Sequence, residues 1–80
     1  MERRSISTIH VRWQTDAPRS STGEWFIETR NAAGETLNDS RQAGWDGPRP
    51  QCYQAHEAER LRLDLQNWEP EAPVFMHTNA

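Results

Sequence analysis

Two stretches of the chain, 8–14 and 24–30, alternate apolar and polar residues with a period of two. β-Branched and aromatic side chains at every second position are typical of a strand with one covered side. The pattern therefore predicts two half-buried strands. Their inward positions are Ile9, Val11 and Trp13 in the first stretch, and Trp25, Ile27 and Thr29 in the second.

Two further strands are predicted from weaker patterns. Residues 31–34 indicate a tight turn because Gly34 can adopt a positive φ. The stretch 35–42 then returns as a short edge strand, in which Leu37 is the one strong apolar anchor. Residues 73–78 predict the last strand. Its two alternating sets are Val74 with Met76, and Phe75 with His77.

A helix is predicted over 53–68. Its apolar residues recur at steps of three and four, which places them along one side of a helix with 3.6 residues per turn. The helix is expected to begin just after Pro50 and to end by Glu69, because Pro70 disfavours a helical conformation in the residue before it. The residues of the apolar stripe are Ala58, Leu61, Leu65 and Trp68, and Leu63 is out of phase with them.

The element order is therefore β-β-β-α-β, and the fold class is α+β: a small antiparallel sheet of three or four strands with one helix packed on one face. Strands adjacent in sequence should form hairpins, and the helix should return the last strand beside the first. The chain of 80 residues makes a single domain spanning 1–80. We expect the ends, 1–4 and 78–80, and the polar connection 15–23 to be flexible.

One helix covers only one side of such a sheet, so the other side is expected to stay open. Aromatic and arginine side chains on that side suit a protein partner or a homodimer. They also resemble the stacking and phosphate contacts of RNA-binding sheets. A third interpretation is that a loop bearing Trp45 packs on Phe26. The outward residues are His10, Arg12, Gln14, Phe26, Glu28 and Arg30, with Phe75 or Met76 from the last strand.

Composition narrows these alternatives. The net charge of −3 argues against a nucleic-acid partner, since affinity for phosphates depends on a positive field. Cys52 is the only cysteine, which excludes an internal disulfide and favours a reducing compartment, so a cytoplasmic location is expected. No apolar run is long enough for a membrane span, and a membrane is not an expected partner.

Catalytic and metal chemistry have little support in the sequence. Cys52 and His56 stand one helical turn apart, which leaves a metal- or thiol-dependent activity as an alternative. Two ligands are too few for a structural metal site, and a reactive thiolate needs an orienting third group. We therefore expect no enzyme activity and no cofactor.

Acidic residues gather along the predicted helix, where they can imitate part of a phosphate backbone. Arg60 interrupts them, with Glu57 three residues before it and Asp64 four after it, so its charge has a partner in both directions. A mixed surface of ion pairs and aromatic anchors is therefore expected rather than a purely acidic one. The candidate partner-binding residues are Arg12, Phe26, Glu28, Arg30, Trp45, Glu57, Arg60 and Asp64.

In its size, acidic character and β-β-β-α-β order, the chain resembles the small inhibitor proteins encoded by bacteriophages, among them the anti-CRISPR proteins. The resemblance rests on no residue motif and carries over no site residue. It implies a cytoplasmic, non-enzymatic inhibitor that binds a CRISPR effector complex and blocks DNA or the recruitment of a nuclease. The predicted function is thus a protein-binding module, and the alternative is a small RNA- or single-stranded-DNA-binding protein that uses the open sheet face.

Overall fold

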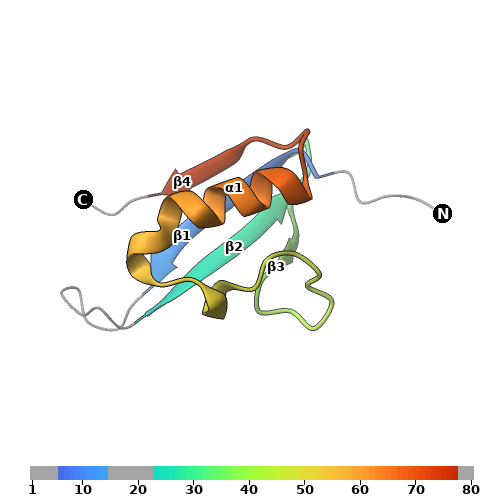
Figure 1. The fold of residues 1–80 in the computed structure, drawn as a ribbon. Coiled ribbons are helices and arrows are strands. Elements are labelled where there is room, and N and C mark those ends of the chain that lie inside the picture. The colour runs from blue at the N-terminus through green and yellow to red at the C-terminus, as the bar shows by residue number, and fades with distance from the viewer. Residues whose placement is uncertain (1–5, 15–22, 78–80) are drawn as a thin grey trace.

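A four-stranded sheet forms one layer of the fold, and a helix with a long irregular segment forms the other (Figure 1). The computed structural model describes residues 6–14 and 23–77. The predictions made for 1–4, 15–22 and 78–80 lie outside these residues. The elements are β1 (Thr8–Gln14), β2 (Glu24–Arg30), β3 (Thr36–Asp39), α1 (Ala58–Trp68) and β4 (Val74–His77), with short 3-10 turns η1 (Pro50–Cys52) and η2 (Ala55–Glu57) before α1.

The strands lie in the order β3-β2-β1-β4, which confirms the predicted neighbours of each strand. β1 pairs antiparallel with β2, and β2 with β3. β4 instead runs parallel to β1, with Val74 beside Ile9, so the sheet is mixed where a wholly antiparallel one was predicted. The cause is the crossover: α1 carries the chain back along the sheet, and β4 then starts from the same end as β1.

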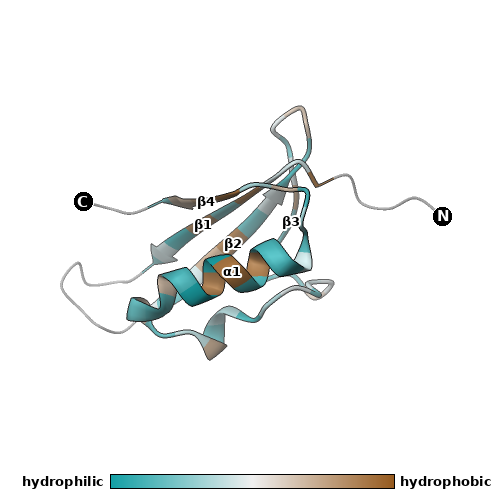
Figure 2. Ribbon diagram, turned by 45° about the horizontal axis from the view of Figure 1, so that its top comes forward, coloured by the Kyte–Doolittle hydropathy of each residue, from teal (hydrophilic) through white to brown (hydrophobic). Residues whose placement is uncertain are grey.

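The face of the sheet toward α1 holds the core. Figure 2 shows hydrophobic and hydrophilic residues interleaved along α1 and the strands, as expected of elements with one covered side. Leu63, the one residue out of phase, is 49% exposed. The buried apolar side chains are Ile9, Val11, Trp25, Ile27, Leu61, Leu65 and Ala72.

The α-helix begins at Ala58 rather than just after Pro50, so the predicted start is wrong. Tyr53 is extended, with φ −123° and ψ 130°, and Gln54 caps the 3-10 turn that follows it. The carbonyl of Gln54 accepts a hydrogen bond of 3.0 Å from the indole of Trp25 on β2. A continuous helix would direct that carbonyl along its own axis, so the tertiary contact favours the break.

A single helix is too narrow for four strands, and the segment between β3 and α1 covers the rest of the inner face. Its anchor is Trp45, whose ring lies 5.1 Å from the ring of Trp68 and whose Nε1 donates to the carbonyl of Pro48. Trp45 therefore packs on the α1 side of the sheet. The interpretation that a loop carrying Trp45 packs on Phe26 is wrong for Trp45, whereas Arg41 of the same segment reaches the Phe26 ring.

β3 is an edge strand, as predicted, but its anchor differs from the predicted one. Leu37 is 37% exposed, whereas Asn38 is buried opposite Thr29. The register shifts between Thr29 and Arg30, which is the mark of a β-bulge. Leu37 is the extra residue of the bulge, since Thr36 and Asn38 pair with Arg30 and Thr29. The backbone carbonyl of Asn38 accepts a hydrogen bond of 3.3 Å from the Thr29 hydroxyl.

The turn before β3 follows the prediction, since Gly34 has φ +85°. Asn31 closes this turn by accepting hydrogen bonds from the backbone N–H groups of Ala33 and Glu35 at 3.0 Å. Over the described ranges 6–14 and 23–77, we find no helix that combines the length and the apolar character needed to cross a bilayer.

Candidate functional site

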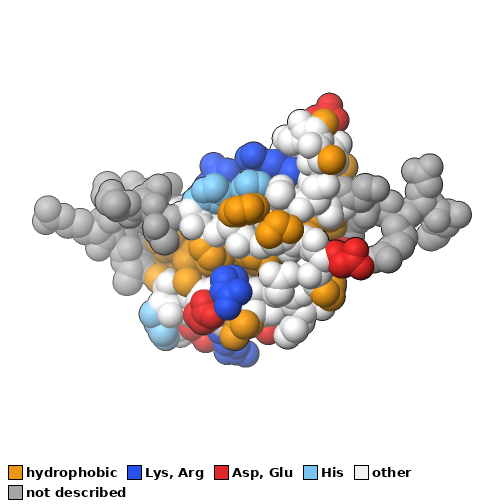
Figure 3. Space-filling view, turned by 90° about the horizontal axis from the view of Figure 1, so that it is seen from above, with side chains coloured by type: hydrophobic (Ala, Val, Ile, Leu, Met, Phe, Trp, Pro, Cys, Tyr) orange, Lys and Arg blue, Asp and Glu red, His pale blue; other side chains and the backbone are white. Residues whose placement is uncertain are grey.

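The sheet face opposite α1 has no covering element among the described residues (Figure 1). Seen from above, arginine and histidine side chains gather on that side of the molecule, and α1 lies on the other (Figure 3). Phe75 is 45% exposed there, which gives the surface an apolar component. We call it the open face, and it consists of His10, Arg12, Gln14, Phe26, Glu28, Arg30, Arg41, Phe75 and His77.

Phe26 lies in the middle of the open face beneath two guanidinium groups. The Cζ atom of Arg12 is 5.8 Å from the ring centroid, and that of Arg41 is 5.0 Å from it. Both distances fall within the range of a cation–π contact. Arg41 comes from the turn after β3, where Asp39 accepts its backbone N–H at 2.8 Å, and its guanidinium donates to the Gln14 side chain.

Glu28 is the acidic centre of the open face. Its carboxylate accepts hydrogen bonds from Arg30 at 2.7 Å and from the Thr36 hydroxyl at 2.8 Å, and Arg12 approaches to 3.8 Å. Partial burial raises the pKa of Glu28, but the hydrogen bonds and the two arginine charges lower it more, so its pKa lies below the ordinary value. Glu28 is thus ionised at neutral pH and ties β2 to both of its neighbours.

Arg12 keeps unused hydrogen-bonding capacity. Its Nε–H is buried and has no hydrogen-bond partner, although its side chain as a whole is 41% exposed. The ion pair with Glu28, at 3.8 Å, is longer than a hydrogen bond. The guanidinium can therefore donate to a further partner without breaking an intramolecular hydrogen bond with Glu28.

His10 lies between Phe75 and His77 on the β4 side of the open face. Its ring centre is 5.3 Å from that of Phe75 and 5.1 Å from that of His77, and the ring planes are within 20°. Nδ1 of His10 and Nε2 of His77 are 2.9 Å apart, a hydrogen-bond distance in which one ring donates to the other. Burial, followed by the charges of Arg30 and His77, lowers the pKa of His10.

Three other candidate residues lie together in the opposite layer, with Glu57 at the end of η2 and Arg60 and Asp64 on α1. Arg60 pairs with Glu57 at 3.1 Å, as expected. On its other side, the guanidinium lies over the Tyr53 ring, and this contact takes the place of the one expected with Asp64. The Tyr53 hydroxyl donates to the Asp64 carboxylate. Burial and then Asp64 raise the pKa of Tyr53 to about 12. The carboxylates of Glu57 and Asp64 are thus engaged in contacts within the chain and do not form a continuous acidic row.

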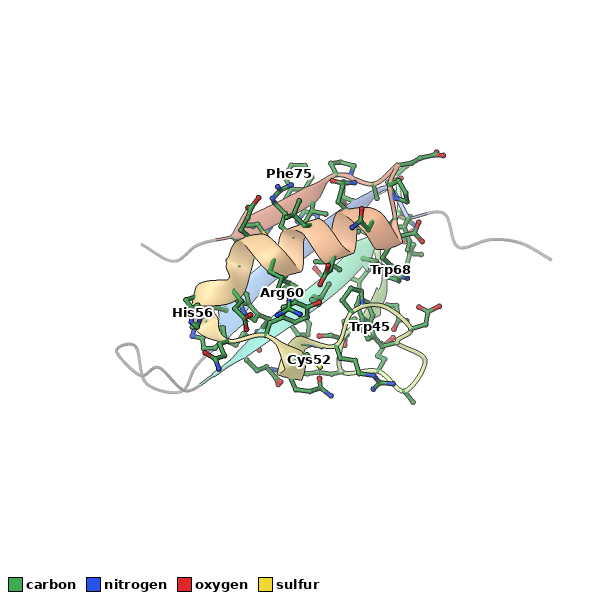
Figure 4. The ribbon with its side chains drawn as sticks, in the orientation of Figure 1. Trp45, Cys52, His56, Arg60, Trp68 and Phe75 are labelled. Atoms are coloured by element: carbon green, nitrogen blue, oxygen red, sulfur yellow. The ribbon has the colours of Figure 1, made fainter. Side chains whose placement is uncertain are left out.

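Trp45 and the Cys52–His56 pair lie apart from the open face (Figure 4). Trp45 is partly buried against Trp68 and belongs to the core. Cys52 lies in η1 and His56 in η2, and Figure 4 shows the two side chains apart from each other. Within the described part of the chain, no group of three or more His, Cys, Asp or Glu side chains is arranged to hold a metal ion.

Two members of the open face, Arg41 and His77, were not among the residues predicted to face outward from the sheet. Arg41 lies in an irregular turn, where period-two patterning carries no information, and only the preceding Asp39 hints at a turn that fixes it. His77 was predicted to share a side of the last strand with Phe75. The sequence did not give the register between β4 and β1, which places the His77 ring within hydrogen-bond distance of the His10 ring.

The open face thus brings four of the candidate residues into one contiguous patch: Arg12, Phe26, Glu28 and Arg30. A second group lies where η2 passes into α1 and consists of Glu57, Arg60 and Asp64. The first group places an aromatic ring, two guanidinium groups and an ionised carboxylate next to one another. Such a surface can bind through stacking, ion pairing and apolar contact at once. Comparison with known proteins finds no matching family model, no matching characterised protein and no matching solved structure.

Proposed function

We propose that this protein is a non-enzymatic protein-binding module whose working surface is the open face. The observation that carries the proposal is the position of Phe26 beneath Arg12 and Arg41, in the middle of a sheet face that no described element covers. Aromatic and arginine side chains held at the centre of a surface are the usual anchors of protein–protein interfaces.

The charges of the open face favour a protein over a nucleic acid as the partner. Glu28 keeps its negative charge at neutral pH and already occupies Arg30 and part of Arg12. A phosphate chain crossing this face would meet that carboxylate at its centre, and the net charge of −3 opposes it at long range. A protein partner can instead offer both signs of charge and an apolar residue for Phe26.

For the partner, we propose a complex that handles nucleic acid, with the module acting as a stoichiometric inhibitor of the anti-CRISPR type. The proposal is supported by the small size, the acidic net charge and the mixed surface of the chain. An inhibitor of this kind occupies its target by contact alone and needs no reaction centre. The open face would then dock on the effector and block either its DNA channel or the site that recruits a nuclease.

The experiment is a titration of the purified protein against purified CRISPR effector complexes of several types, with DNA binding and DNA cleavage as the readouts. We expect inhibition of one type to be complete near one protein per complex. Phe26→Ala should weaken that inhibition at least about tenfold, since loss of a central aromatic anchor costs about 2 kcal/mol or more of binding energy.

Leu63→Ala is the matched control, because it removes an exposed apolar side chain from α1, on the opposite layer. Inhibition unchanged in Leu63→Ala and lost in Phe26→Ala assigns the contact to the open face. If Phe26→Ala inhibits as well as the parent, the open face is not the working surface. If no effector of any type is inhibited, the proposed target class is wrong.

One feature favours a second candidate, a small binder of single-stranded nucleic acid. The rings of His10, Phe75 and His77 stand side by side with similar orientations, and such rings can stack with bases. A shift of labelled single-stranded RNA or DNA that weakens steeply with salt, and disappears in Phe75→Ala, would favour this candidate over the protein-binding module.

A further inference from the structure

The free edge of β4 differs from the free edge of β3. An edge strand presents unpaired N–H and C=O groups, and proteins protect such edges with charges, bulges or covering segments. β3 has a bulge and ends in Asp39, and the chain then turns back over the inner face. β4 (Val74–His77) has no residue with a formal charge, no register shift and no described segment beyond it.

The pairing with β1 tells which groups of β4 point away from the sheet. The backbone N–H of Ile9 donates to the carbonyl of Pro73 at 3.0 Å, and Ile9 stands beside Val74. In a parallel ladder, Ile9 then bonds to residues 73 and 75, so the amide groups of Val74 and Met76 point outward. Figure 3 looks onto this edge, and hydrophobic side chains run along it between the arginine-rich side and α1.

We infer that this edge pairs with the same edge of a second copy of the chain, which joins two sheets into one across a two-fold axis. The lack of charge on β4 lets two identical strands approach without repulsion. On β3, by contrast, Asp39 and the nearby Glu35 would place like charges together. The inference is independent of the proposed function, because the backbone edge of β4 carries it and not the Phe26 centre of the open face.

The alternation of β4 restricts the register of this pairing. A two-fold axis perpendicular to the sheet keeps the open faces of both copies on the same side. Phe75 must therefore lie opposite a residue of the partner strand whose side chain is also on the open face. The outward N–H and C=O groups of Val74 and Met76 satisfy each other when Val74 lies opposite Met76 of the second copy. Phe75 then lies opposite Phe75, as a pair whose side chains approach closely.

The helix layer adds a complementary contact. Of the strands, α1 approaches β4 most closely. Arg62 lies one turn before Gln66, whose side chain bonds to the carbonyls leading into β4, so Arg62 and its partner Glu59 lie on the β4 flank of α1. In the inferred dimer, we expect Arg62 of each copy to face Glu59 of the other. A four-residue strand alone makes a small interface, and this second contact enlarges it.

Amide hydrogen exchange of the full chain tests the inference directly. At low concentration, where the protein is monomeric, the N–H groups of Val74 and Met76 should exchange rapidly and that of Phe75, which faces β1, slowly. Once the concentration is about tenfold above the dissociation constant, Val74 and Met76 should slow about fivefold, since mass action then leaves about a fifth of the chains monomeric. Phe75 should not change.

Substitutions separate the edge from the open face. Met76→Pro removes an outward N–H that an edge strand can lose, and it should raise the dimer dissociation constant, measured by analytical ultracentrifugation, at least about tenfold. Met76→Ala is the matched control, because it shortens the same side chain and keeps the N–H. Arg62→Glu should weaken the dimer, and the double exchange Arg62→Glu with Glu59→Arg should restore it.

The inference is overturned if the protein sediments as a monomer up to about 1 mM, well above the dissociation constants of specific interfaces. It is equally overturned if dimers form but Phe26→Ala, and not Met76→Pro, abolishes them, since the open face would then be the interface. If Met76→Pro does not fold, the exchange rates of Val74 and Met76 decide. Protection of these amides by a target protein, but never by concentration, assigns the edge to a different occupant and also overturns it.

Discussion

The two faces of the sheet are built from the same strands and differ in what holds them together. On the inner face, Ile9, Val11 and Ile27 are completely buried and belong to the hydrophobic core. On the outer face, which is the open face, Arg12 and Phe26 occupy the alternate positions of the same strands. They are held by charge and ring contacts and remain partly exposed. Alternate positions of one strand therefore supply two different kinds of interaction.

Under the proposed function, this difference separates the residues that stabilise the fold from those that bind a partner. Apolar burial contributes about 25 cal/mol per Å² removed from water, so the inner face supplies most of the stabilising free energy. Partly exposed ion pairs contribute little to folding, and Arg12–Glu28 and Arg30–Glu28 belong to that class. Substitutions on the outer face should alter binding and leave the fold intact, whereas those on the inner face should do the reverse.

The sharpest test of this separation compares two neighbours, Ile27 and Phe26. Ile27→Ala should lower the free energy of unfolding by about 2–4 kcal/mol, because it leaves a cavity at a fully buried site. Phe26→Ala should lower it by about 1 kcal/mol, since the ring is partly exposed and loses mainly its contacts with two guanidinium groups. Urea unfolding measures both, and equal losses would mean that the outer face is also part of the core.

The irregular half of the inner layer can be tested at Gly47. A Cβ atom there would lie 2.9 Å from the Trp45 ring and 3.0 Å from the Trp68 ring, so Gly47→Ala must separate the two indoles. Overpacking of this kind costs about 1–3 kcal/mol. We expect a lower urea midpoint and an altered tryptophan fluorescence spectrum in the folded state.

Gly44→Ala is the matched control for that substitution. A Cβ atom at Gly44 would meet nothing within 4 Å. The control should therefore unfold within about 0.5 kcal/mol of the parent, as surface substitutions usually do. If both variants lose the same stability, the Trp45–Trp68 contact does not hold the irregular segment in place.

The strands and the core were predictable because their information is local. Alternation in 8–14 and 24–30 needs no knowledge of the neighbouring strand, and a stripe at steps of three and four places Leu61 and Leu65 inward. The part of the open face that lies on these strands followed from the same alternation. Arg12, Phe26, Glu28 and Arg30 were therefore expected on one surface, and the register of β1 and β2 places them there.

The remaining features depend on contacts between distant segments. The start of α1 is decided by a hydrogen bond from Trp25 to Gln54, the burial of Asn38 by a bulge, and the position of Trp45 by its contact with Trp68. None of these contacts leaves a periodic pattern in the sequence. Arg41 escaped prediction for the same reason, because it reaches the open face from a turn.

The junction between the two layers gives a test of intermediate size. The side-chain amide of Gln66, near the end of α1, donates to the carbonyls of Glu69, Pro70 and Ala72 at 3.1–3.3 Å. Gln66→Ala should lower the free energy of unfolding by about 1–2 kcal/mol, because these carbonyls lose their donor where the chain turns into β4.

Two further variants define what that loss means. Gln66→Glu keeps the shape of the side chain but replaces the donating group by an acceptor, so it should be at least as destabilising as Gln66→Ala. Asn67→Ala, at the next and exposed position, should change stability by less than about 0.5 kcal/mol. Thermal unfolding followed by circular dichroism distinguishes the three, and a Gln66→Glu variant as stable as the parent would contradict the assignment.

The smallest effect is expected from pH, and it comes from the outer face. The pKa of His10 is lowered in the folded protein from the ordinary 6.5, so below pH 6.5 the unfolded chain binds more protons than the folded one. Stability should therefore decline as pH falls from 6.5 toward the lowered pKa of His10, and this contribution should be constant above pH 6.5. The same reasoning applies to Glu28 in a separate window, because its pKa lies below the ordinary 4.5 and its contribution declines as pH falls below that value.

His10→Gln separates these two contributions. The variant should lose the part of the pH dependence that His10 causes just below pH 6.5, while the decline below pH 4.5 should persist because Glu28 keeps its contacts with Thr36 and Arg30. Urea unfolding at intervals between pH 7.5 and pH 3.5 measures the slope in each window, and the slope matters here because the substitution also changes stability at every pH. Since His10 is partly exposed, solvent screening keeps its contribution to the free energy of unfolding well below the loss of unfolding free energy expected for Ile27→Ala. An unchanged slope near pH 6 in His10→Gln would show that the contacts of His10 with Phe75 and His77 do not disfavour its protonation, and the outer face would then respond to acid only through its carboxylates.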